Sequence, residues 1–354
     1  FMSMVLGLFA SNPKILAAPL AGNEPLPSPN HPLKAVPINE TTSSLQVSLD
    51  QRLSMAQSAR KAGDRILAIS LYKEIVTLDP DHLVTRVELA ETLADEDQFD
   101  EARGHLDFVQ KVNPTWIPVY LTRGALEQQA QNELSALKAF NQALVIEPAN
   151  RFAIEGRLLA LSRLGSPGRA LAEAKAYSDL DPEIIQRLHE DEAAQAIRRS
   201  ENVYHEHPSS ALSTADAALV LIEANLKRYP ASERSRFDYV RALTNRRRHY
   251  QAIGVYEVLM AENSELPGYI HYSAAVSYLA DLRPERVKET FKIALAADPD
   301  EFNTYTGLFY ALCDLAEFTA AKTHIDFLSA RNLEPEQKFE TDMLAAWANA
   351  YEDR

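Results

Sequence analysis

The residues of this chain that could do chemistry are a histidine cluster, one cysteine and one glycine-rich turn. The segment 205–207 (His-Glu-His), with His189 nearby, holds metal-ligating residue types, but alternate residues on a helix do not share a face. Cys313 has no base at a spacing recognised for a catalytic thiol, so we expect a small apolar core residue there. The turn 165–168 lacks the lysine and the preceding strand of a phosphate-binding loop. The sequence therefore predicts no enzyme, no metal site and no cofactor.

Composition and charge limit the classes of partner. The 354 residues are 46% hydrophobic, enough for a sizeable core, and include only 11 glycines, which disfavours a turn-rich β-fold. The formal net charge of -14 argues against nucleic acid, whose binding requires Lys and Arg to neutralise phosphates. We therefore expect no nucleic-acid partner and favour a cationic one.

The N-terminal segment 1–21 resembles a secretory signal. A short apolar run is followed by small residues that end in Ala-Pro-Leu-Ala, as in the hydrophobic and cleavage regions of such signals. The run is too short for a membrane-spanning helix, and a disordered apolar tail is the alternative. Because the chain starts at Phe1 without a basic region, we expect that it was cut or mis-started upstream. Segment 22–48, rich in Pro, Asn, Ser and Thr, is predicted to be a disordered linker.

The strongest pattern is a proline that recurs every 34 residues after an acid or an amide. The dipeptides are Asp79-Pro80, Asn113-Pro114, Glu147-Pro148 and Asp181-Pro182. An alanine lies twelve residues before each proline. The residue eight positions before the proline is large and apolar in three repeats and is an alanine in the fourth. The pairs are Ala68 and Tyr72, Ala102 and Leu106, Ala136 and Phe140, and Ala170 and Ala174. This spacing is the second half of the tetratricopeptide pattern, whose period is 34.

The pattern predicts an all-α fold, a solenoid of tetratricopeptide helical hairpins. Small residues at the eighth and twentieth slots of each repeat let two antiparallel helices approach closely, and Tyr72, Phe140 and Phe291 fill the space beside them. Proline ends the second helix because it lacks an N–H donor and clashes with the preceding turn. We expect the acid or amide before it to cap the next helix, with proline at the first helical position. A single hairpin cannot bury its apolar face, so the units stack.

The repeats predict the following domain organisation. Residues 49–182 hold four repeats, and 183–230 hold longer, irregular helices in which the 34-residue period is lost. Residues 231–335 hold further repeats, including Phe291 and Pro299. Residues 336–354 resemble the first helix of a truncated repeat. We expect the natural polypeptide to continue beyond Arg354.

Repeat solenoids bind partners along a surface lined by first-helix residues, at the second, fifth, ninth, twelfth and thirteenth slots. These slots predict a binding groove that includes Glu91, Asp95, Gln128, Tyr269 and Tyr272. Between residues 86 and 110, acids outnumber Lys and Arg by eight to two, which indicates a local acidic field, although an ordinary solvated helix surface has the same composition. Two further tyrosines, Tyr278 and Tyr310, are expected at the eleventh slot, in the core.

The second half of the chain, about residues 185 to 354, resembles a known family. The pieces that carry the resemblance are Leu266-Pro267-x-Tyr269, Arg283-Pro284-Glu285 and Gly307-Leu308-Phe309-Tyr310. They are similar to the periplasmic helical-repeat region of the poly-β-1,6-N-acetylglucosamine export porin family. The first four repeats fit that family too, but they would fit any tetratricopeptide protein.

The resemblance implies a location and two partners. Members of that family sit in the outer membrane of Gram-negative bacteria, with their repeats in the periplasm and a C-terminal β-barrel, absent from this chain, that conducts the polymer for the biofilm matrix. The repeats would dock the lipoprotein deacetylase that trims the polymer and guide the polymer to the pore. Partial deacetylation exposes amines, so the polysaccharide is cationic near neutral pH and an acidic solenoid would attract it.

Two alternatives remain open. One is a general protein-binding tetratricopeptide adaptor, such as a cytosolic co-chaperone that recognises peptide tails. The signal-like start disfavours it, as does the shortage of basic groove residues: the first repeat offers Arg60 and Lys61, but the second offers Glu91 and Asp95. The other is the repeat scaffold of a different exopolysaccharide system, such as cellulose export.

Overall fold

The structure is a computed structural model that describes residues 40–206, 208–263 and 265–352. The chain divides into two compact units, residues 1–51 and 52–354, and helix α2 (Glu40–Lys61) contains the boundary between them. The predicted signal segment 1–21 and most of the predicted linker lie outside the described residues. The structure differs from the prediction at residues 40–48, which belong to α2 rather than to the linker. Pro37 is the last proline before α2, so no proline interrupts that helix.

The described residues are helical and contain no strand. The helices that follow α2 in the first four repeats are α3 (Arg65–Leu78), α4 (Leu83–Ala94), α5 (Phe99–Val112), α6 (Ile117–Gln129), α7 (Glu133–Ile146), α8 (Arg151–Arg163) and α9 (Pro167–Ala174). The two long helices α10 (Pro182–Glu206) and α11 (Pro208–Arg228) occupy the segment where the 34-residue period is lost. The later helices are α12 (Glu233–Asn245), α13 (His249–Glu262), α14 (Gly268–Ala280), α15 (Pro284–Ala297), α16 (Phe302–Asp314), α17 (Phe318–Ser329) and α18 (Pro335–Glu352).

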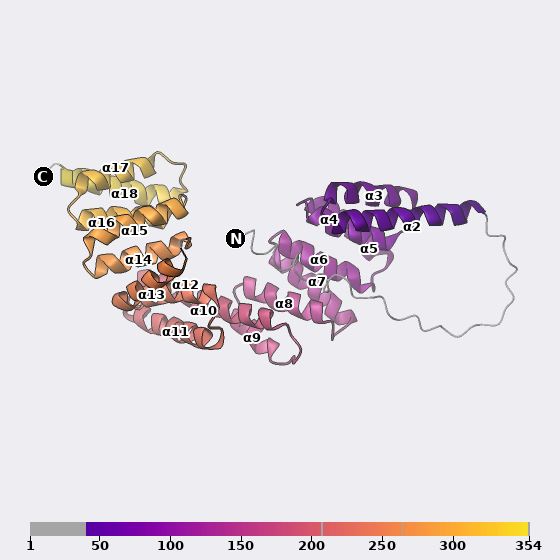
Figure 1. The fold of residues 1–354 in the computed structure, drawn as a ribbon, viewed down its shortest axis with the longest axis horizontal. Helices are drawn as coiled ribbons and strands as arrows, with labels where there is room; N and C mark the ends of the chain where they lie inside the picture. The colour runs from indigo at the N-terminus through magenta and orange to yellow at the C-terminus, as the bar shows by residue number, and fades with distance from the viewer. Residues whose placement is uncertain (1–39, 207, 264, 353–354) are drawn as a thin grey trace. The chain divides into compact units, whose positions relative to one another are not determined.

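From α3 to α18, consecutive helices pack side by side in chain order, as Figure 1 shows. The even-numbered helices are the first helices of the hairpins. From α4 to α16 each of them also contacts the first helix of the next hairpin, so they form a continuous layer. From α5 to α17, the odd-numbered second helices contact the first helix on either side along the chain. This is the all-α hairpin solenoid that the period predicts.

The residues that define the repeat lie in its core. Those predicted to pack between the helices are all fully buried, namely Ala68, Tyr72, Ala102, Ala136, Phe140 and Phe291. They belong to two of the three successive apolar clusters that run along the solenoid. The core is therefore a chain of interfaces between neighbouring hairpins, and no single centre holds the protein together.

Phe140 of α7 shows why glycine recurs in the first helices. Its ring fills the space that a side chain would need at both Gly124 of α6 and Gly156 of α8, where an added Cβ would lie 2.4 Å from ring carbons. The same packing recurs in the second half of the chain, where a Cβ at Gly307 of α16 would lie 3.0 Å from the ring of Phe291. Each aromatic ring therefore joins its own hairpin to the next one.

The structure corrects the predicted role of the residue before the proline at four positions, whereas Asp181 accepts a hydrogen bond from Glu183 N of α10 at 2.9 Å, as predicted. Asp79, Asn113, Glu147 and Asp298 cap the C-terminus of the second helix, and the backbone N–H of Asp79, for example, donates to Ile75 O at 2.8 Å. In the turns after Pro80 and Pro148, the residue two positions after the proline caps the next helix: His82 accepts from Thr85 N, and Asn150 from Ala153 N.

The prolines themselves lie in the turns. Pro80, Pro114, Pro148 and Pro299 precede the next helix by three residues, because the chain needs a short turn to reverse direction between antiparallel helices. Among the prolines that follow the acid or amide of the repeat, Pro182 alone begins a helix, α10, as the prediction for the first helical position required. In the part of the chain that the structure describes, no helix is long and apolar enough to cross a membrane.

Candidate binding surface on the layer of first helices

The candidate site is the surface formed by the predicted binding slots of the first helices, which we call the A-layer face. Its slots are counted so that Ala90, Gly124 and Ala275 are eighth in α4, α6 and α14. Side chains at these slots contact the same face of the next first helix, usually 31 residues away in the chain. The A-layer face is therefore a connected surface whose polar residues have partners from neighbouring repeats.

Glu91 links three consecutive first helices. Its Oε2 lies 2.8 Å from Arg60 Nη1 of α2, and its Oε1 accepts a hydrogen bond from Thr122 Oγ1 of α6 at 2.9 Å. One turn away, Gln57 Nε2 donates to Glu88 Oε1 at 2.8 Å. The structure thus uses Glu91, predicted as a groove residue, as a strut between repeats.

Gln128 is likewise engaged within the solenoid. It is 7% exposed, and its Nε2 donates to Gly156 O of α8 at 3.0 Å. Asp95 remains partly exposed at the end of α4, with its Oδ2 3.9 Å from Arg65 Nε. Burial raises the pKa of both Asp95 and Glu88, so the carboxylates at this end of the A-layer face hold their charge less readily than solvated ones.

The tyrosines of α14 lie on the same face, farther along the chain. Tyr269 is 36% exposed, and the guanidinium of Arg241 lies 5.8 Å from its ring centroid. Tyr272 is more buried and packs edge-on against Phe291, with ring centroids 6.0 Å apart. Burial raises the pKa of Tyr269 to about 12, so its hydroxyl stays protonated and can donate a hydrogen bond at neutral pH. The structure leaves Tyr269 the more accessible of the two.

Tyr310 corrects a sequence prediction. It was expected in the core with Tyr278, but it is 45% exposed, whereas Tyr278 is buried. Because α16 begins at Phe302, Tyr310 occupies the ninth slot, on the A-layer face, and its neighbour Phe309 takes the core position. Its ring centroid lies 6.4 Å from that of Trp347 on α18, which is also partly exposed.

The sequence analysis missed a group of arginines on α8, α10 and α12. Arg163, Arg187, Arg234 and Arg241 surround carboxylates that include Glu190, Asp191, Glu201 and Asp238. The prediction that basic groove residues are scarce rested on the first two repeats, and the lost register over 183–230 hid this group. The spacing of Arg187, Asp191 and Arg198 on α10 could have revealed it, because residues four and eleven apart share a helix face.

Two carboxylates of this arginine group are buried. Asp238 is 5% exposed, and burial raises its pKa to about 6 despite the nearby Arg234 and Arg241. Glu190 accepts a hydrogen bond from Ser232 Oγ at 2.7 Å, and Glu201 forms a two-pronged pair with Arg241, with both distances 2.6 Å. The group therefore combines buried carboxylates with a network of ion pairs between α10 and α12.

Comparisons with known proteins agree with this geometry. The family model described as tetratricopeptide repeat matches residues 59–126, the stretch that contains the Glu91 strut. This chain is a tetratricopeptide-repeat-containing protein. No curated protein matches it.

Several solved tetratricopeptide-like structures are similar to the chain. The Cut9–Hcn1 hetero-tetramer of APC/C matches with a TM-score of 0.50 and 12% identity, over 87% of this chain and 57% of that one. A tetratricopeptide repeat protein from Parabacteroides merdae matches with a TM-score of 0.39 and 13% identity, over 84% of this chain and 99% of that one. The type IV pilus biogenesis factor PilW matches with a TM-score of 0.47 and 15% identity, over 64% of this chain and 99% of that one. At these identities the likeness concerns the fold alone.

The residues first considered for chemistry take structural places in the repeats. His189 Nδ1 lies 3.1 Å from Tyr229 Oη and contacts Ile185 O, whereas His207 lies outside the described residues. Cys313 is partly buried against the core, and burial raises the pKa of its thiol. Within residues 40–206, 208–263 and 265–352, no three His, Cys, Asp or Glu side chains are grouped so that they could hold a metal ion.

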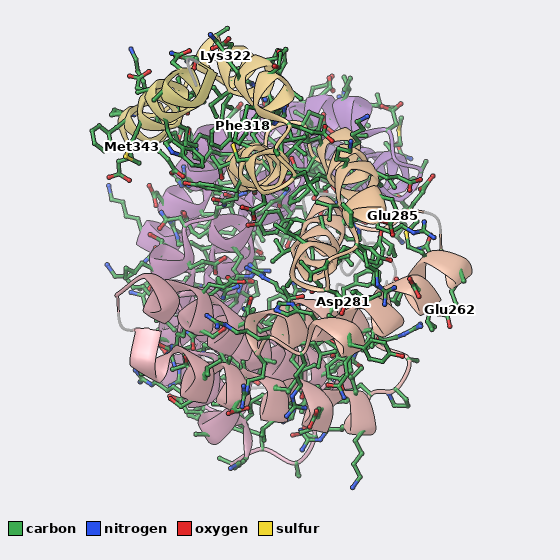
Figure 2. The ribbon with its side chains drawn as sticks, turned by 90° about the vertical axis from the view of Figure 1, so that its left-hand side faces the viewer. Glu262, Asp281, Glu285, Phe318, Lys322 and Met343 are labelled. Atoms are coloured by element: carbon green, nitrogen blue, oxygen red, sulfur yellow. The ribbon has the colours of Figure 1, made fainter. Side chains whose placement is uncertain are left out.

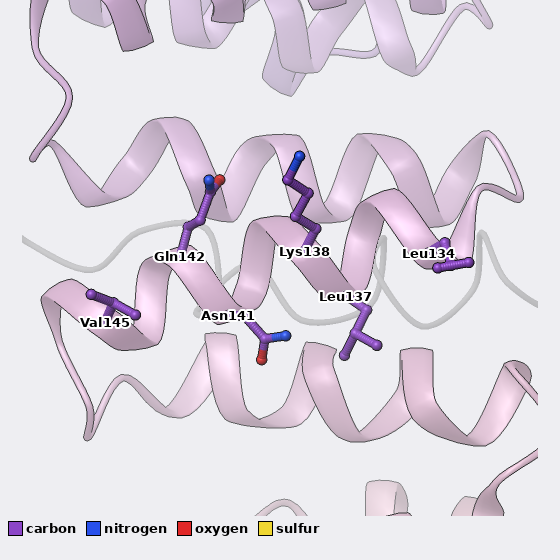
Figure 3. A pocket seen from close by; sticks show the side chains of 6 residues that line it. All are labelled: Leu134, Leu137, Lys138, Asn141, Gln142 and Val145. Carbon is purple, nitrogen blue, oxygen red and sulfur yellow. The ribbon is translucent and has the colours of Figure 1, made fainter.

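Two further apolar features are exposed. On the tetratricopeptide second helix α7, Leu134 and Val145 are exposed beside a shallow depression of about 360 Å³, shown in Figure 3. On α18, Phe339, Met343 and Trp347 follow one another at four-residue spacing and are all exposed; Figure 2 labels Met343. Four-residue spacing places them on one side of that helix.

Proposed function

We propose that this chain is the repeat scaffold of an exopolysaccharide export system of the poly-β-1,6-N-acetylglucosamine type. The observation that carries the proposal is the row of exposed aromatic rings along the last first helices, Tyr269, Tyr310 and Trp347. Aromatic faces attract cationic groups that lie over the ring. A partly deacetylated amino-sugar polymer offers such cations on every deacetylated unit.

Charge supports the same ligand. The chain carries a formal net charge of -14, and the segment around α4 and α5 is rich in acids. A cationic polymer would be attracted over about 10 Å at moderate salt, and the attraction would be screened at high salt. The A-layer face would then guide the polymer by long-range attraction and hold it by contact with aromatic rings.

The resemblance of residues 185–354 to the export porins supports the rest of the proposal. It favours the periplasmic side of the outer membrane as the location, and a polysaccharide deacetylase lipoprotein as the protein partner. Tandem repeats of this kind present long surfaces to protein partners. A general protein-binding adaptor is the second candidate, and the arginine group on α10 and α12 favours it.

The test is a titration with hexameric β-1,6-linked glucosamine, followed by tryptophan fluorescence. The chain has two tryptophans, so the Trp116→Phe variant leaves Trp347 as the only reporter. We expect the emission of Trp347 to change on binding and the affinity to fall at least tenfold between about 50 and 500 mM NaCl. Tyr310→Ala should weaken binding about threefold to tenfold, because it removes a cation–π contact between an amine of the polymer and an exposed or partly desolvated ring.

Two results would contradict the proposal. One is an emission spectrum that the hexamer leaves unchanged at low salt. The other is an affinity that neither salt nor Tyr310→Ala changes, which would remove both the electrostatic and the aromatic parts of the argument. Fractionation of cells that express the native gene would test the location independently.

A further inference from the structure

Tyr310 of α16 and Trp347 of α18 form an aromatic pair that a carboxylate accompanies. The two rings are exposed and tilted by 46°, with their centroids 6.4 Å apart. Glu340 lies two turns before Trp347 on α18, and residues seven apart share one side of a helix. Burial and the charge of Glu340 raise the pKa of the Tyr310 hydroxyl, which places this carboxylate near the ring. Two aromatic rings and one carboxylate therefore meet between α16 and α18.

The charges of these first helices are not balanced. Helices α14, α16 and α18 together contain five acids, and Lys338 is their only Lys or Arg. Lys338 lies two residues before Glu340, and residues two apart on a helix do not face each other. Among the described residues, the side chains of Glu340 and of Asp314, four residues after Tyr310, form no hydrogen bond or ion pair. This part of the A-layer face thus offers negative charge that no cation of its own helices neutralises.

We propose that Glu340 makes this subsite select free amines over acetylated ones, with the rings of Tyr310 and Trp347 as its walls. The inference rests on the proposed function and assigns the selectivity of that binding surface. The ammonium group of a deacetylated sugar unit lies over the Tyr310 ring and pairs with the Glu340 carboxylate. An acetamido group is neutral, so an acetylated unit gains neither the ion pair nor the cation–π contact and keeps only the contact with the ring faces.

The arrangement of the rings favours a sugar polymer over a basic peptide. Exposed aromatic rings recur on consecutive first helices, at Tyr269 of α14, Tyr310 of α16 and Trp347 of α18. A polymer of repeating units can use such a series of flat apolar faces one after another. A bound peptide also needs partners for its backbone N–H and C=O groups. Asn303, at the second slot of α16, is already engaged, because its Nδ2 donates to Glu301 Oε1 at 2.8 Å.

The test compares two β-1,6-linked hexamers, one of glucosamine and one of N-acetylglucosamine, by isothermal titration calorimetry with the full chain. We expect the glucosamine hexamer to bind about tenfold more tightly at about 50 mM NaCl. Glu340→Gln should weaken the glucosamine hexamer about threefold to tenfold, the effect of losing a partly exposed ion pair, and should leave the acetylated hexamer unchanged. The matched control is Asp342→Asn, which removes the same charge from an exposed position on another side of α18 and should change neither affinity.

Three results would overturn the inference. Equal weakening by Glu340→Gln and Asp342→Asn would leave only the general charge of the chain as the cause. Weakening of both hexamers alike by Glu340→Gln would show a structural role, which a lowered thermal midpoint of that variant would also reveal. Tighter binding of hexalysine than of the glucosamine hexamer, with a loss in Glu340→Gln, would assign the subsite to a basic peptide.

The same titrations separate this inference from the proposed function. If both hexamers bind and Glu340→Gln changes neither affinity, the polymer still binds the A-layer face, but Glu340 does not select its amines. If neither hexamer binds to the parent chain, the proposed function and this inference both fail.

Discussion

The Cα of Gly124 faces the edge of the Phe140 ring so closely that a Cβ there would lie 2.4 Å from Phe140 Cε1. An added Cβ at Gly156 of the next hairpin would also lie 2.4 Å from this ring, at Phe140 Cζ. The ring therefore fixes the distance between α6, α7 and α8, and the repeats tolerate no methyl group at either glycine.

Gly124→Ala should consequently destabilise the protein by about 1–3 kcal/mol, the usual cost of overpacking a core. Urea denaturation would measure the change in the free energy of unfolding. Gly104→Ala is the matched control, because Gly104 lies in helix α5 with nothing within 4 Å of an added Cβ. That variant should stabilise the protein by about 0.5–1 kcal/mol. Equal effects of the two substitutions would contradict the packing argument.

Glu91 should matter for stability through its bonds to Arg60 and Thr122. Glu91→Ala breaks a strut that joins three hairpins, so we expect a loss of about 1–3 kcal/mol in the free energy of unfolding. Glu101→Ala removes an exposed pair with Lys73 and should cost less than about 1 kcal/mol. If the two variants unfold at the same urea concentration, Glu91 is not a strut.

Arg103 neutralises a carboxylate that the fold buries. Its Nε and Nη2 lie 2.8 and 3.0 Å from the two oxygens of Glu127, whose side chain is 5% exposed. Arg103→Ala leaves that charge buried without a partner, at a cost of about 3 kcal/mol, and Arg103→Lys should recover part of it. Thermal unfolding would rank the two variants. Arg169→Ala, at an exposed pair with Glu173, should unfold like the parent chain, and a similar loss there would refute the burial argument.

Asp238 should make stability depend on pH. Burial raises its pKa from 3.8 to about 6, so between these values the folded protein keeps a proton that the unfolded chain has lost. Its contribution to the free energy of unfolding is therefore fully present below about pH 4 and is lost as pH rises through about 6. Asp238→Asn cannot titrate, so its stability relative to the parent chain should improve by about 1–3 kcal/mol between pH 4.5 and pH 7.

The measurement for Asp238 is urea denaturation of both proteins at the two pH values. The nearby charges of Arg234, Arg241 and Glu190 are common to both, so the difference isolates Asp238. Asp326→Asn, at an exposed position on α17, is the control and should follow the parent chain at both values. A constant difference between parent and Asp238→Asn would show that Asp238 does not titrate in this range.

The helical hairpins could be predicted because their signals are local. Prolines at 34-residue intervals, with Ala and aromatic residues at fixed offsets, determine where second helices end and which residues are buried, and Ala68, Phe140 and Phe291 are buried accordingly. The details of the turns could not be predicted in the same way. His82 and Asn150 cap the first helices in place of Asp79 and Glu147, because the turn inserts residues between the proline and the next helix.

By itself, the sequence determined that this protein is a stack of helical hairpins, since period and composition act within each repeat. Only the tertiary structure decided which slot residues remain available on the A-layer face. Glu91 and Gln128 are engaged by residues 28 to 31 positions away, and Tyr310 moves out of the core with the start of α16. The physical reason is that a side chain's freedom depends on what the neighbouring hairpin places opposite it, and that is set by packing between repeats rather than by position within one.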